Sequence, residues 1–216
     1  MSVCRLCFAK TTTIWRYKDR EYQRCSSCFL IQLQRSQCPA PAAEEAEYQL
    51  HKNDPYDIGY RRFLSPVTAI MLEWLQTKKS IHPVILDFGS GPGPTISVVL
   101  GEHGWNVRNY DPFFQPDTAA LQIKYDLISS TEVVEHFYEP NKSWKLLFSL
   151  GKKSCQLVVM TQCSDPYYSE TAFQNWRYIR EKSHVAFYHS RTMEWIAAAY
   201  GFQITQRTAN VFWFSR

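Results

Sequence analysis

The sequence predicts an α/β fold, and three observations support that prediction. Residues 84–86 form a short apolar run that ends in Asp87, as is typical of a strand buried in a parallel sheet. Glycines follow at alternate positions, Gly89, Gly91 and Gly93, where the chain can turn sharply from a strand into a helix. Further strand-like runs, at 105–110, 125–130 and 156–161, alternate with segments of helical spacing. We therefore expect a mostly parallel sheet covered by helices.

Length and charge narrow the class of protein. At 216 residues, the chain has room for one medium domain and a small appendage. A net charge of +4 permits a nucleic-acid partner without requiring one. The N-terminus has no charged-then-apolar leader, and no apolar run approaches the ~20 residues that span a bilayer. We therefore expect a soluble, cytoplasmic protein with no membrane partner.

The first 40 residues contain two pairs of cysteines. Cys4 and Cys7 form one Cys-x-x-Cys knuckle, Cys25 and Cys28 form the other, and seventeen residues separate them. This spacing is typical of a four-cysteine zinc ribbon, in which a short hairpin, here 11–17 and 21–24, brings the pairs together. We expect a structural Zn²⁺ ion, because a closed four-cysteine site leaves no coordination position open for chemistry. Redox-active pairs are the alternative, and we expect three reduced thiols elsewhere: Cys38, Cys155 and Cys163.

A change in composition separates this ribbon from the rest of the chain. Residues 37–47 contain two prolines and an acidic run, a composition that favours a linker. We therefore predict a zinc-ribbon-like domain over residues 1–40 and a larger α/β domain over residues 41–216. In the larger domain, apolar residues at helical spacing predict helices over 62–78, 140–150 and 191–200. Gly201 is expected to end the last of these helices.

The segment after Asp87 is typical of a nucleotide cradle. Its glycines let a ligand approach the main chain, and a helix from about Thr95 would point its free N–H groups into the same crevice. The strand over 105–110 ends at Asp111, whose carboxylate is placed to accept hydrogen bonds from two ribose hydroxyls. The spacing Asp-x-Gly-x-Gly-x-Gly differs from the Gly-x-Gly-x-x-Gly fingerprint of dinucleotide-binding domains.

This spacing resembles motif I of the class I S-adenosylmethionine-dependent methyltransferases. Together with Tyr-Asp-Pro-Phe-Phe at 110–114 and His-Val-Ala-Phe-Tyr at 184–188, it makes the whole chain similar to uncharacterised bacterial members with a zinc-ribbon-like N-terminal segment. The resemblance implies a Rossmann-like methyltransferase sheet, mostly parallel, with a C-terminal antiparallel hairpin over 202–208 and 211–215. It also implies S-adenosylmethionine as cofactor, bound by Asp87, Gly89, Ser90, Gly91, Gly93, Asp111 and Thr131. A nicotinamide-binding domain or a non-catalytic Rossmann domain is the alternative.

One departure from that family is visible in the sequence. Only about a dozen residues separate the segment after Asp111 from the strand over 125–130. The third strand–helix unit that is usual in the family must therefore be shortened or replaced by a brief helix. For this reason the sequence does not identify the residues that contact the adenine.

The strand over 125–130 delivers acidic and imidazole side chains to the carboxyl edge of the sheet. If a helical turn begins there, Glu132, Glu135 and His136 share one face, and they could form an acid/base site or bind a divalent cation. The Glu-x-x-Glu-His pattern is similar to that of metal-assisted O-methyltransferases. That resemblance implies His184, just before a helix with Trp195, as a further ligand. A second divalent cation such as Mg²⁺, a general base and a purely structural role remain open.

Aromatic residues surround His184 and could stack on a planar substrate or form core: Trp176, Tyr178, Phe187 and Tyr188. The sequence thus predicts a methyltransferase that favours an oxygen of a small molecule as acceptor. One alternative is an RNA methyltransferase whose ribbon docks the RNA. The other is a cofactor-binding module without turnover. Neither the acceptor nor the oligomeric state follows from the sequence.

Overall fold

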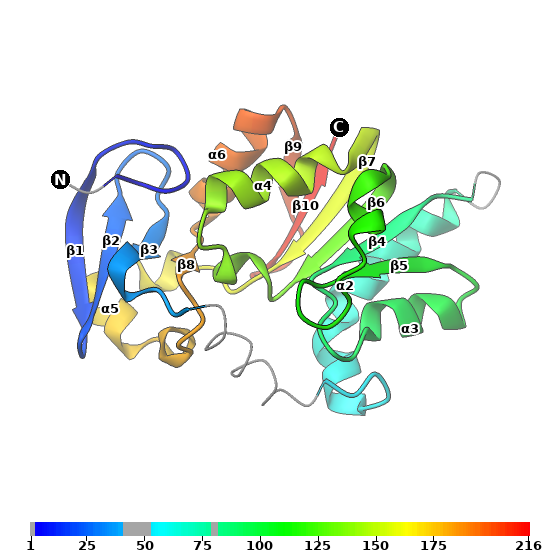
Figure 1. Cartoon of the computed structure of the whole chain (residues 1–216), viewed down its shortest axis with the longest axis horizontal. Coiled ribbons are helices and arrows are strands. Elements are labelled where there is room, and N and C mark those ends of the chain that lie inside the picture. The colour runs from blue at the N-terminus through cyan, green and yellow to red at the C-terminus, as the bar shows by residue number, and fades with distance from the viewer. Residues whose placement is uncertain (1–2, 41–52, 79–81) are drawn as a thin grey trace.

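The computed structural model describes residues 3–40, 53–78 and 82–216, which form two sheets joined by helices (Figure 1). A four-stranded sheet, in the order β1-β2-β3-β8, lies at the N-terminal end of the molecule. A six-stranded sheet, in the order β5-β4-β6-β7-β10-β9, forms the centre of the larger part. The expected α/β fold is confirmed.

The six-stranded sheet is parallel except at one edge. Its first four strands in space are β5 (Val107–Tyr110), β4 (Ile85–Phe88), β6 (Tyr125–Thr131) and β7 (Gly151–Met160), and neighbours in this group pair in parallel. β10 (Val211–Ser215) pairs antiparallel with both β7 and β9 (Gln203–Gln206). The mostly parallel sheet and the C-terminal antiparallel hairpin are therefore confirmed.

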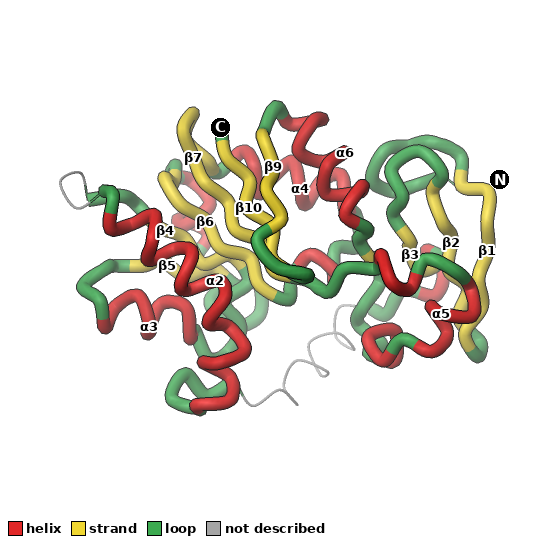
Figure 2. The backbone as a smooth tube through the Cα atoms, turned by 180° about the vertical axis from the view of Figure 1, so that it is seen from behind, coloured by secondary structure: helices red, strands yellow, loops and turns green. Residues whose placement is uncertain are grey.

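Helices cover both faces of this sheet (Figures 1 and 2). On one face, α2 (Ile58–Gln76) and α3 (Thr95–Glu102) pack on a cluster that includes Ile85 and Leu127. On the other face, α4 (Pro140–Ser149) and α6 (Ser190–Tyr200) pack on a cluster that includes Leu86 and Ile128. Successive strand residues point to opposite faces, which explains why neighbours in sequence belong to different clusters.

The predicted helices are present with shifted ends. α2 begins four residues before the expected start at 62, because the carboxylate of Asp57 caps it by accepting a hydrogen bond from the Tyr60 amide at 2.6 Å. α6 ends at Gly201, whose φ of 70° is the left-handed conformation that glycine adopts freely. Between β5 and β6 lies the short 3-10 helix η2 (Thr118–Gln122), which confirms that a brief helix stands in for the third unit.

The N-terminal sheet begins with the predicted hairpin. β1 (Thr11–Tyr17) and β2 (Arg20–Cys25) are antiparallel, and β3 (Ile31–Leu33) follows. The fourth strand, β8 (Ala186–Phe187), comes from the other end of the chain and pairs with β3. The predicted linker over 37–47 starts inside the 3-10 helix η1 (Arg35–Gln37), and its residues 41–47 lie outside the described residues. The division into 1–40 and 41–216 stays a prediction.

Short helices occupy the region between β7 and α6. They are η4 (Asp165–Tyr167), α5 (Glu170–Asn175) and η5 (Arg177–Arg180), and they pack beside the hairpin β1–β2 (Figure 1). All seven cysteines are free in the structure, and the reduced state of Cys38, Cys155 and Cys163 stays a prediction. Within the described residues, every helix is too short or too polar to cross a membrane.

Candidate functional site

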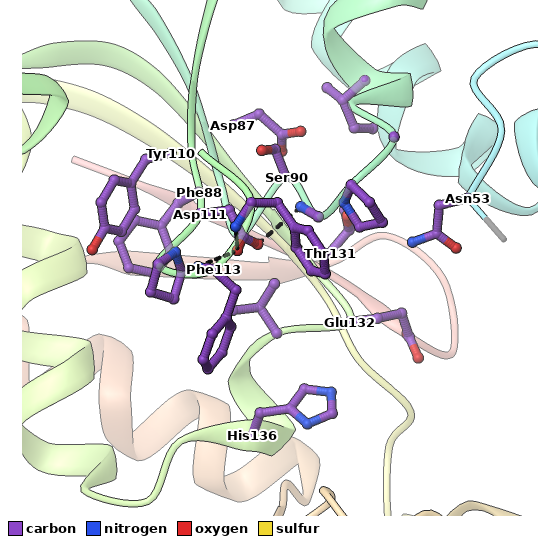
Figure 3. A pocket seen from close by; sticks show the side chains of 18 of the residues that line it. Asn53, Asp87, Phe88, Ser90, Tyr110, Asp111, Phe113, Thr131, Glu132 and His136 are labelled. Carbon is purple, nitrogen blue, oxygen red and sulfur yellow. Dashed lines mark hydrogen bonds between the residues drawn. The ribbon is translucent and has the colours of Figure 1, made fainter. Parts of the chain in front are cut away.

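The glycine loop joins β4 to α3 and forms one wall of a cavity of about 680 Å³ (Figure 3). Gly89 and Gly91 have φ values of 80° and 64°, a conformation that is strained for any residue with a Cβ. A Cβ at Gly89 would lie 2.3 Å from Cγ2 of Val133, and one at Gly93 would lie 1.5 Å from the carbonyl oxygen of Asn53. The loop therefore requires glycine for its backbone turn and for close packing against its neighbours.

Asp111 fastens this loop to the end of β5. Its Oδ2 accepts a hydrogen bond from the Gly91 amide at 2.9 Å, and its Oδ1 accepts from the amides of Phe113 and Phe114 at 2.9 and 3.0 Å. The carboxylate is 7% exposed and lines the cavity. Each oxygen has two lone pairs, so Asp111 can order the loop and also accept hydrogen bonds from a ligand.

Two further polar groups at the end of β4 face the same cavity. Asp87 is 2% exposed, its Oδ1 accepts a hydrogen bond from the Ser129 hydroxyl at 2.8 Å, and burial raises its pKa to about 7. The Ser90 hydroxyl is buried and has no hydrogen-bond partner within the described part of the chain. A buried hydroxyl without a partner is costly, so its place on the cavity wall fits a ligand that supplies the missing hydrogen bond.

The chain turns abruptly after β6. Glu132 has a φ of 52°, and the 3-10 helix η3 (Val134–His136) begins only two residues later. The expected helical turn with Glu132, Glu135 and His136 on one face is therefore wrong, because the left-handed Glu132 lies outside the turn. A non-glycine residue in this conformation costs roughly 1 kcal/mol, and such strain is concentrated at functional sites.

Tyr178 connects the two glutamates instead. Its hydroxyl lies 3.2 Å from Oε2 of Glu132 and also contacts Oε1 of Glu135, while the Thr161 hydroxyl donates to Oε2 of Glu135 at 3.0 Å. Burial raises the pKa of Glu135 to about 7, and burial together with the charge of Glu135 raises the pKa of Glu132. One phenolic proton cannot satisfy both carboxylates, so the pair favours a bound proton or cation.

Two imidazoles complete this side of the cavity. Nδ1 of His136 lies 3.1 Å from the Ser183 carbonyl oxygen, and Nδ1 of His184 lies 2.8 Å from the Tyr178 carbonyl oxygen. A carbonyl oxygen only accepts, so each Nδ1 carries a proton, and the neutral form of each ring would have its lone pair on Nε2. Ligand atoms of Glu135, His136 and His184 all lie within 4.8 Å of one another. One carboxylate and two imidazoles are a donor set that suits a catalytic divalent cation.

The four cysteines of the ribbon also come together. Their sulfur atoms lie within 4.8 Å of one another, with Sγ–Sγ distances of 3.6 Å for Cys4 and Cys28 and 3.4 Å for Cys7 and Cys25. A tetrahedral zinc site with bonds of about 2.3 Å has sulfur–sulfur edges of about 3.8 Å, close to these values. The Cys28 thiol lowers the pKa of Cys4 to about 6. The arrangement fits a zinc ion.

The two cysteine knuckles are closed by equivalent hydrogen bonds. The amide of Phe8 donates to the Cys4 carbonyl oxygen at 3.0 Å, and the amide of Phe29 donates to the Cys25 carbonyl oxygen at 3.1 Å. Both phenylalanines have positive φ values, of 61° and 65°. Two identical turns with strained residues at matching positions indicate that the sulfur geometry is what this segment is built to maintain.

The cavity collects almost all of the predicted cofactor and catalytic residues. All seven predicted cofactor residues line it, and so do Glu132, His136 and His184. Glu135 is fully buried behind the wall. Sequence reasoning missed Asn53, whose carbonyl packs on the glycine loop, and the roles of Thr161 and Tyr178 as partners of Glu135. The aromatic cluster around His184 was the only local signal for Tyr178.

Comparison with known proteins adds a family match. A family model described as a methyltransferase domain matches residues 56–207, which contain the glycine loop, the two glutamates and both histidines of the cavity. The four cysteines lie outside that match. No curated protein sequence matches the chain.

Solved structures with similar folds include several methyltransferases. A magnesium protoporphyrin IX methyltransferase from Synechocystis PCC 6803 with bound SAH has a TM-score of 0.54 at 16% identity, covering 74% of this chain and 84% of that one. An O-methyltransferase family protein from Burkholderia thailandensis has a TM-score of 0.52 at 11% identity, covering 80% of this chain and 62% of that one. A protein from Pyrococcus horikoshii OT3 has a TM-score of 0.55 at 13% identity, covering 79% and 98%. At these identities the likeness shows a common fold.

Proposed function

The chain belongs to the methyltransferase-domain family and is an S-adenosylmethionine-dependent methyltransferase, and we propose that it methylates an oxygen atom of a small molecule with the help of a divalent cation. The observation that carries this proposal is the three-residue donor set Glu135, His136 and His184. His136 and Glu132 lie across the cavity from Asp87, Ser90 and Asp111 (Figure 3). One cavity thus offers a cofactor side and an acceptor side.

On the cofactor side, the glycine loop provides the surface against which S-adenosylmethionine would bind. When bound, that cofactor would supply a sulfonium methyl group, whose carbon a nucleophile attacks in line while the carbon–sulfur bond breaks and the neutral thioether leaves. Asp111 would accept hydrogen bonds from ribose hydroxyls, and the Ser90 hydroxyl would gain the partner that it lacks. Gly89, Gly91, Gly93 and Thr131 line the same wall, and Asp87 adds a carboxyl group that favours a cationic ligand once it ionises.

On the acceptor side, Glu135 and the Nε2 atoms of His136 and His184 would hold the divalent cation. When bound, the cation would lower the pKa of an acceptor hydroxyl and orient it toward the methyl group. The carbonyl groups of Ser183 and Tyr178 keep both histidines in the tautomer that ligation needs. Glu132, whose pKa is raised by burial, is the carboxyl group that would take up the acceptor's proton.

The charge of the cavity supports a cation at this place. Among the described residues that line it, five are acidic and none is lysine or arginine: Asp87, Asp111, Glu132, Glu139 and Glu181. Glu139 is already paired with Arg35. Burial raises the pKa of Asp87 and of Glu132, because a buried carboxylate is unfavourable unless it takes up a proton or lies beside a cation. A volume of about 680 Å³ is in the range of small-molecule sites, which favours a small acceptor over a polymer.

The ribbon's Zn²⁺ has a different role in this proposal. Cys4, Cys7, Cys25 and Cys28 would fill all four positions of a tetrahedral ion. Such a site has no position for a substrate, so it contributes to folding and not to methyl transfer.

The test is calorimetric titration of S-adenosylmethionine and then of Mn²⁺ into protein dialysed without a chelator. We expect cofactor binding and a separate Mn²⁺ isotherm that His136→Ala and His184→Ala abolish. His103→Ala is the matched control, since His103 is exposed at the end of α3. Cofactor binding without a Mn²⁺ isotherm would contradict the divalent cation and favour a methyltransferase that uses a general base. Failure to bind the cofactor would contradict the proposal as a whole.

A further inference from the structure

The ribbon and the acceptor side of the cavity share one sheet. β3 of the ribbon pairs with β8, which begins two residues after His184. The pairing continues upstream, because the Leu33 amide donates to the Val185 carbonyl oxygen at 2.9 Å. The Val185 amide in turn donates to the carbonyl oxygen of Glu135 at 2.9 Å. Two hydrogen bonds therefore lead from the ribbon to the backbone of the buried glutamate.

Arg20 makes a second and denser connection. It lies at the start of β2, and its Nη1 donates to the carbonyl oxygens of Ile179 and Glu181 at 3.2 and 3.3 Å. Its Nη2 donates to the carbonyl oxygens of Lys182 and His184 at 3.2 and 3.1 Å. One guanidinium thus binds four carbonyl groups of the loop 179–184, the segment that ends at His184.

The position of Arg20 is itself fixed within the ribbon. Its guanidinium lies 5.3 Å from the ring centroid of Tyr22, which is fully buried in the same sheet. A planar guanidinium offers five N–H donors in a rigid fork, so it can hold several carbonyls in one geometry. The ammonium of lysine is a point charge with three donors and cannot reproduce that arrangement.

Hydrogen bonds on the cofactor side come from other parts of the chain. The amides of Gly89 and Ser90 donate to the Tyr110 carbonyl oxygen, and the Gly91 amide donates to Asp111. These bonds join the loop after β4 to the end of β5, at one edge of the six-stranded sheet, whereas β8 belongs to the four-stranded sheet. A change in the ribbon should therefore reach the acceptor side first and leave the cofactor side intact.

We infer that the ribbon is the support of the acceptor side and that Arg20 is the positioning residue through which it holds His184 in place. The inference gives the ribbon a function in methyl transfer beyond docking or stability. It rests on the proposed function, because it assumes that His184 acts on the acceptor side.

The experiment compares Arg20→Ala with Arg16→Ala in the full chain with its zinc retained. Arg16 is in the same hairpin, but among the described residues its side chain pairs only with Glu21, on the exposed surface. We expect Arg20→Ala to weaken Mn²⁺ binding, followed by the electron paramagnetic resonance signal of free Mn²⁺, by roughly 10–100-fold, as is typical for residues that orient metal ligands. The affinity for S-adenosylmethionine should stay unchanged, and Arg20→Lys should recover only part of the Mn²⁺ affinity.

Amide hydrogen exchange gives a second measurement that needs no metal. Arg20→Ala should speed exchange across residues 179–185, while Arg16→Ala should leave it at the wild-type rate. The inference is overturned if the two variants agree in both Mn²⁺ affinity and exchange while His184→Ala abolishes Mn²⁺ binding. If wild-type protein does not bind Mn²⁺, or if His184→Ala binds it as tightly as the wild type, the proposed function fails. Amide exchange across residues 179–185 then decides by itself whether Arg20 holds this loop in place.

Discussion

At the scale of single residues, the cavity places carboxyl groups where water cannot stabilise them. Asp87 and Glu135 are both buried, and burial raises the pKa of each to about 7. Glu132 adds a strained backbone to the same region. A protein selected only for stability would not keep these groups without cationic partners. The free-energy cost of burying these carboxyl groups is explained if positively charged ligands bind beside them.

Asp87 allows a test of this cost through pH. Its pKa is about 7 in the folded chain against 3.8 for the unperturbed group, so between these values the folded protein holds a proton that the unfolded chain has lost. The contribution of Asp87 to stability therefore falls as pH rises through this window and stays low above it. Asp87→Asn should remove this loss and raise the free energy of unfolding near pH 8 by about 2–4 kcal/mol, with a much smaller gain near pH 4.

Urea unfolding of both proteins at several pH values measures the effect. Asp19→Asn, at an exposed position in the ribbon hairpin, is the control and should follow the wild-type pH dependence. A gain for Asp87→Asn that does not change with pH would show that Asp87 does not bind a proton in this window.

At the scale of elements, short turns carry the chemistry and long elements hold them in place. The glycine loop closes against Val133 and Asn53, and the two cysteine knuckles close through matching hydrogen bonds at Phe8 and Phe29. In each case the turn contains positive φ values, which glycine adopts freely and which are strained for the phenylalanines of the knuckles. The neighbouring strands and helices must supply the free energy that maintains these turns.

The glycine loop gives a matched pair of variants. Gly89→Ala places a Cβ 2.3 Å from Cγ2 of Val133 at a φ of 80°, so the loop must move and cofactor affinity should fall by at least roughly tenfold. Gly101→Ala lies in α3 with nothing within 4 Å of its Cβ, so it should leave affinity unchanged and stabilise the helix by about 0.5–1 kcal/mol. Calorimetry and thermal unfolding check both. Equal cofactor affinities would show that the ligand does not depend on this loop.

At the scale of the whole molecule, the ribbon and the large sheet share one hydrophobic core. A single cluster of buried side chains contains Cys4 and Cys28 of the ribbon, Trp144 of α4, Tyr188 directly after β8, and Met193 of α6. The Trp144 indole donates to the Tyr188 hydroxyl at 3.2 Å, and that hydroxyl donates to the Val134 carbonyl oxygen at 2.9 Å. The core thus runs from the cysteines to the turn that carries Glu135.

Loss of zinc should consequently affect the whole protein. Cys25→Ser should release the ion and lower the melting temperature in a single transition, because the ribbon cannot unfold without exposing the shared core. Cys38→Ser is the control, since Cys38 lies outside the knuckles and should keep the zinc. Elemental analysis and calorimetric scanning measure the two effects. Absence of zinc from wild-type protein purified without chelator would refute the metal site, and a separate early transition would refute the coupling.

Features that depend on residues close together in the sequence could be predicted, whereas features that depend on distant contacts could not. Strand and helix positions, the glycine loop and the cysteine knuckles could be predicted because each depends on residues a few positions apart. The turn after β6 could not, since the left-handed Glu132 is imposed by its amide donating to the Met160 carbonyl oxygen on the neighbouring strand at 2.8 Å. The sequence pattern of residues 131–137 does not predict that contact with the neighbouring strand.

By itself, the sequence determined the α/β class, the order of the strands along the chain, the cradle between Asp87 and Asp111 and the pairing of the two cysteine knuckles. Only the tertiary structure decided that Tyr178 joins the two glutamates, that β8 completes the ribbon's sheet, and that Arg20 binds the loop before His184. The physical reason is that these contacts join residues about 45 to 165 positions apart, and they form only when packing of the shared core brings both partners together.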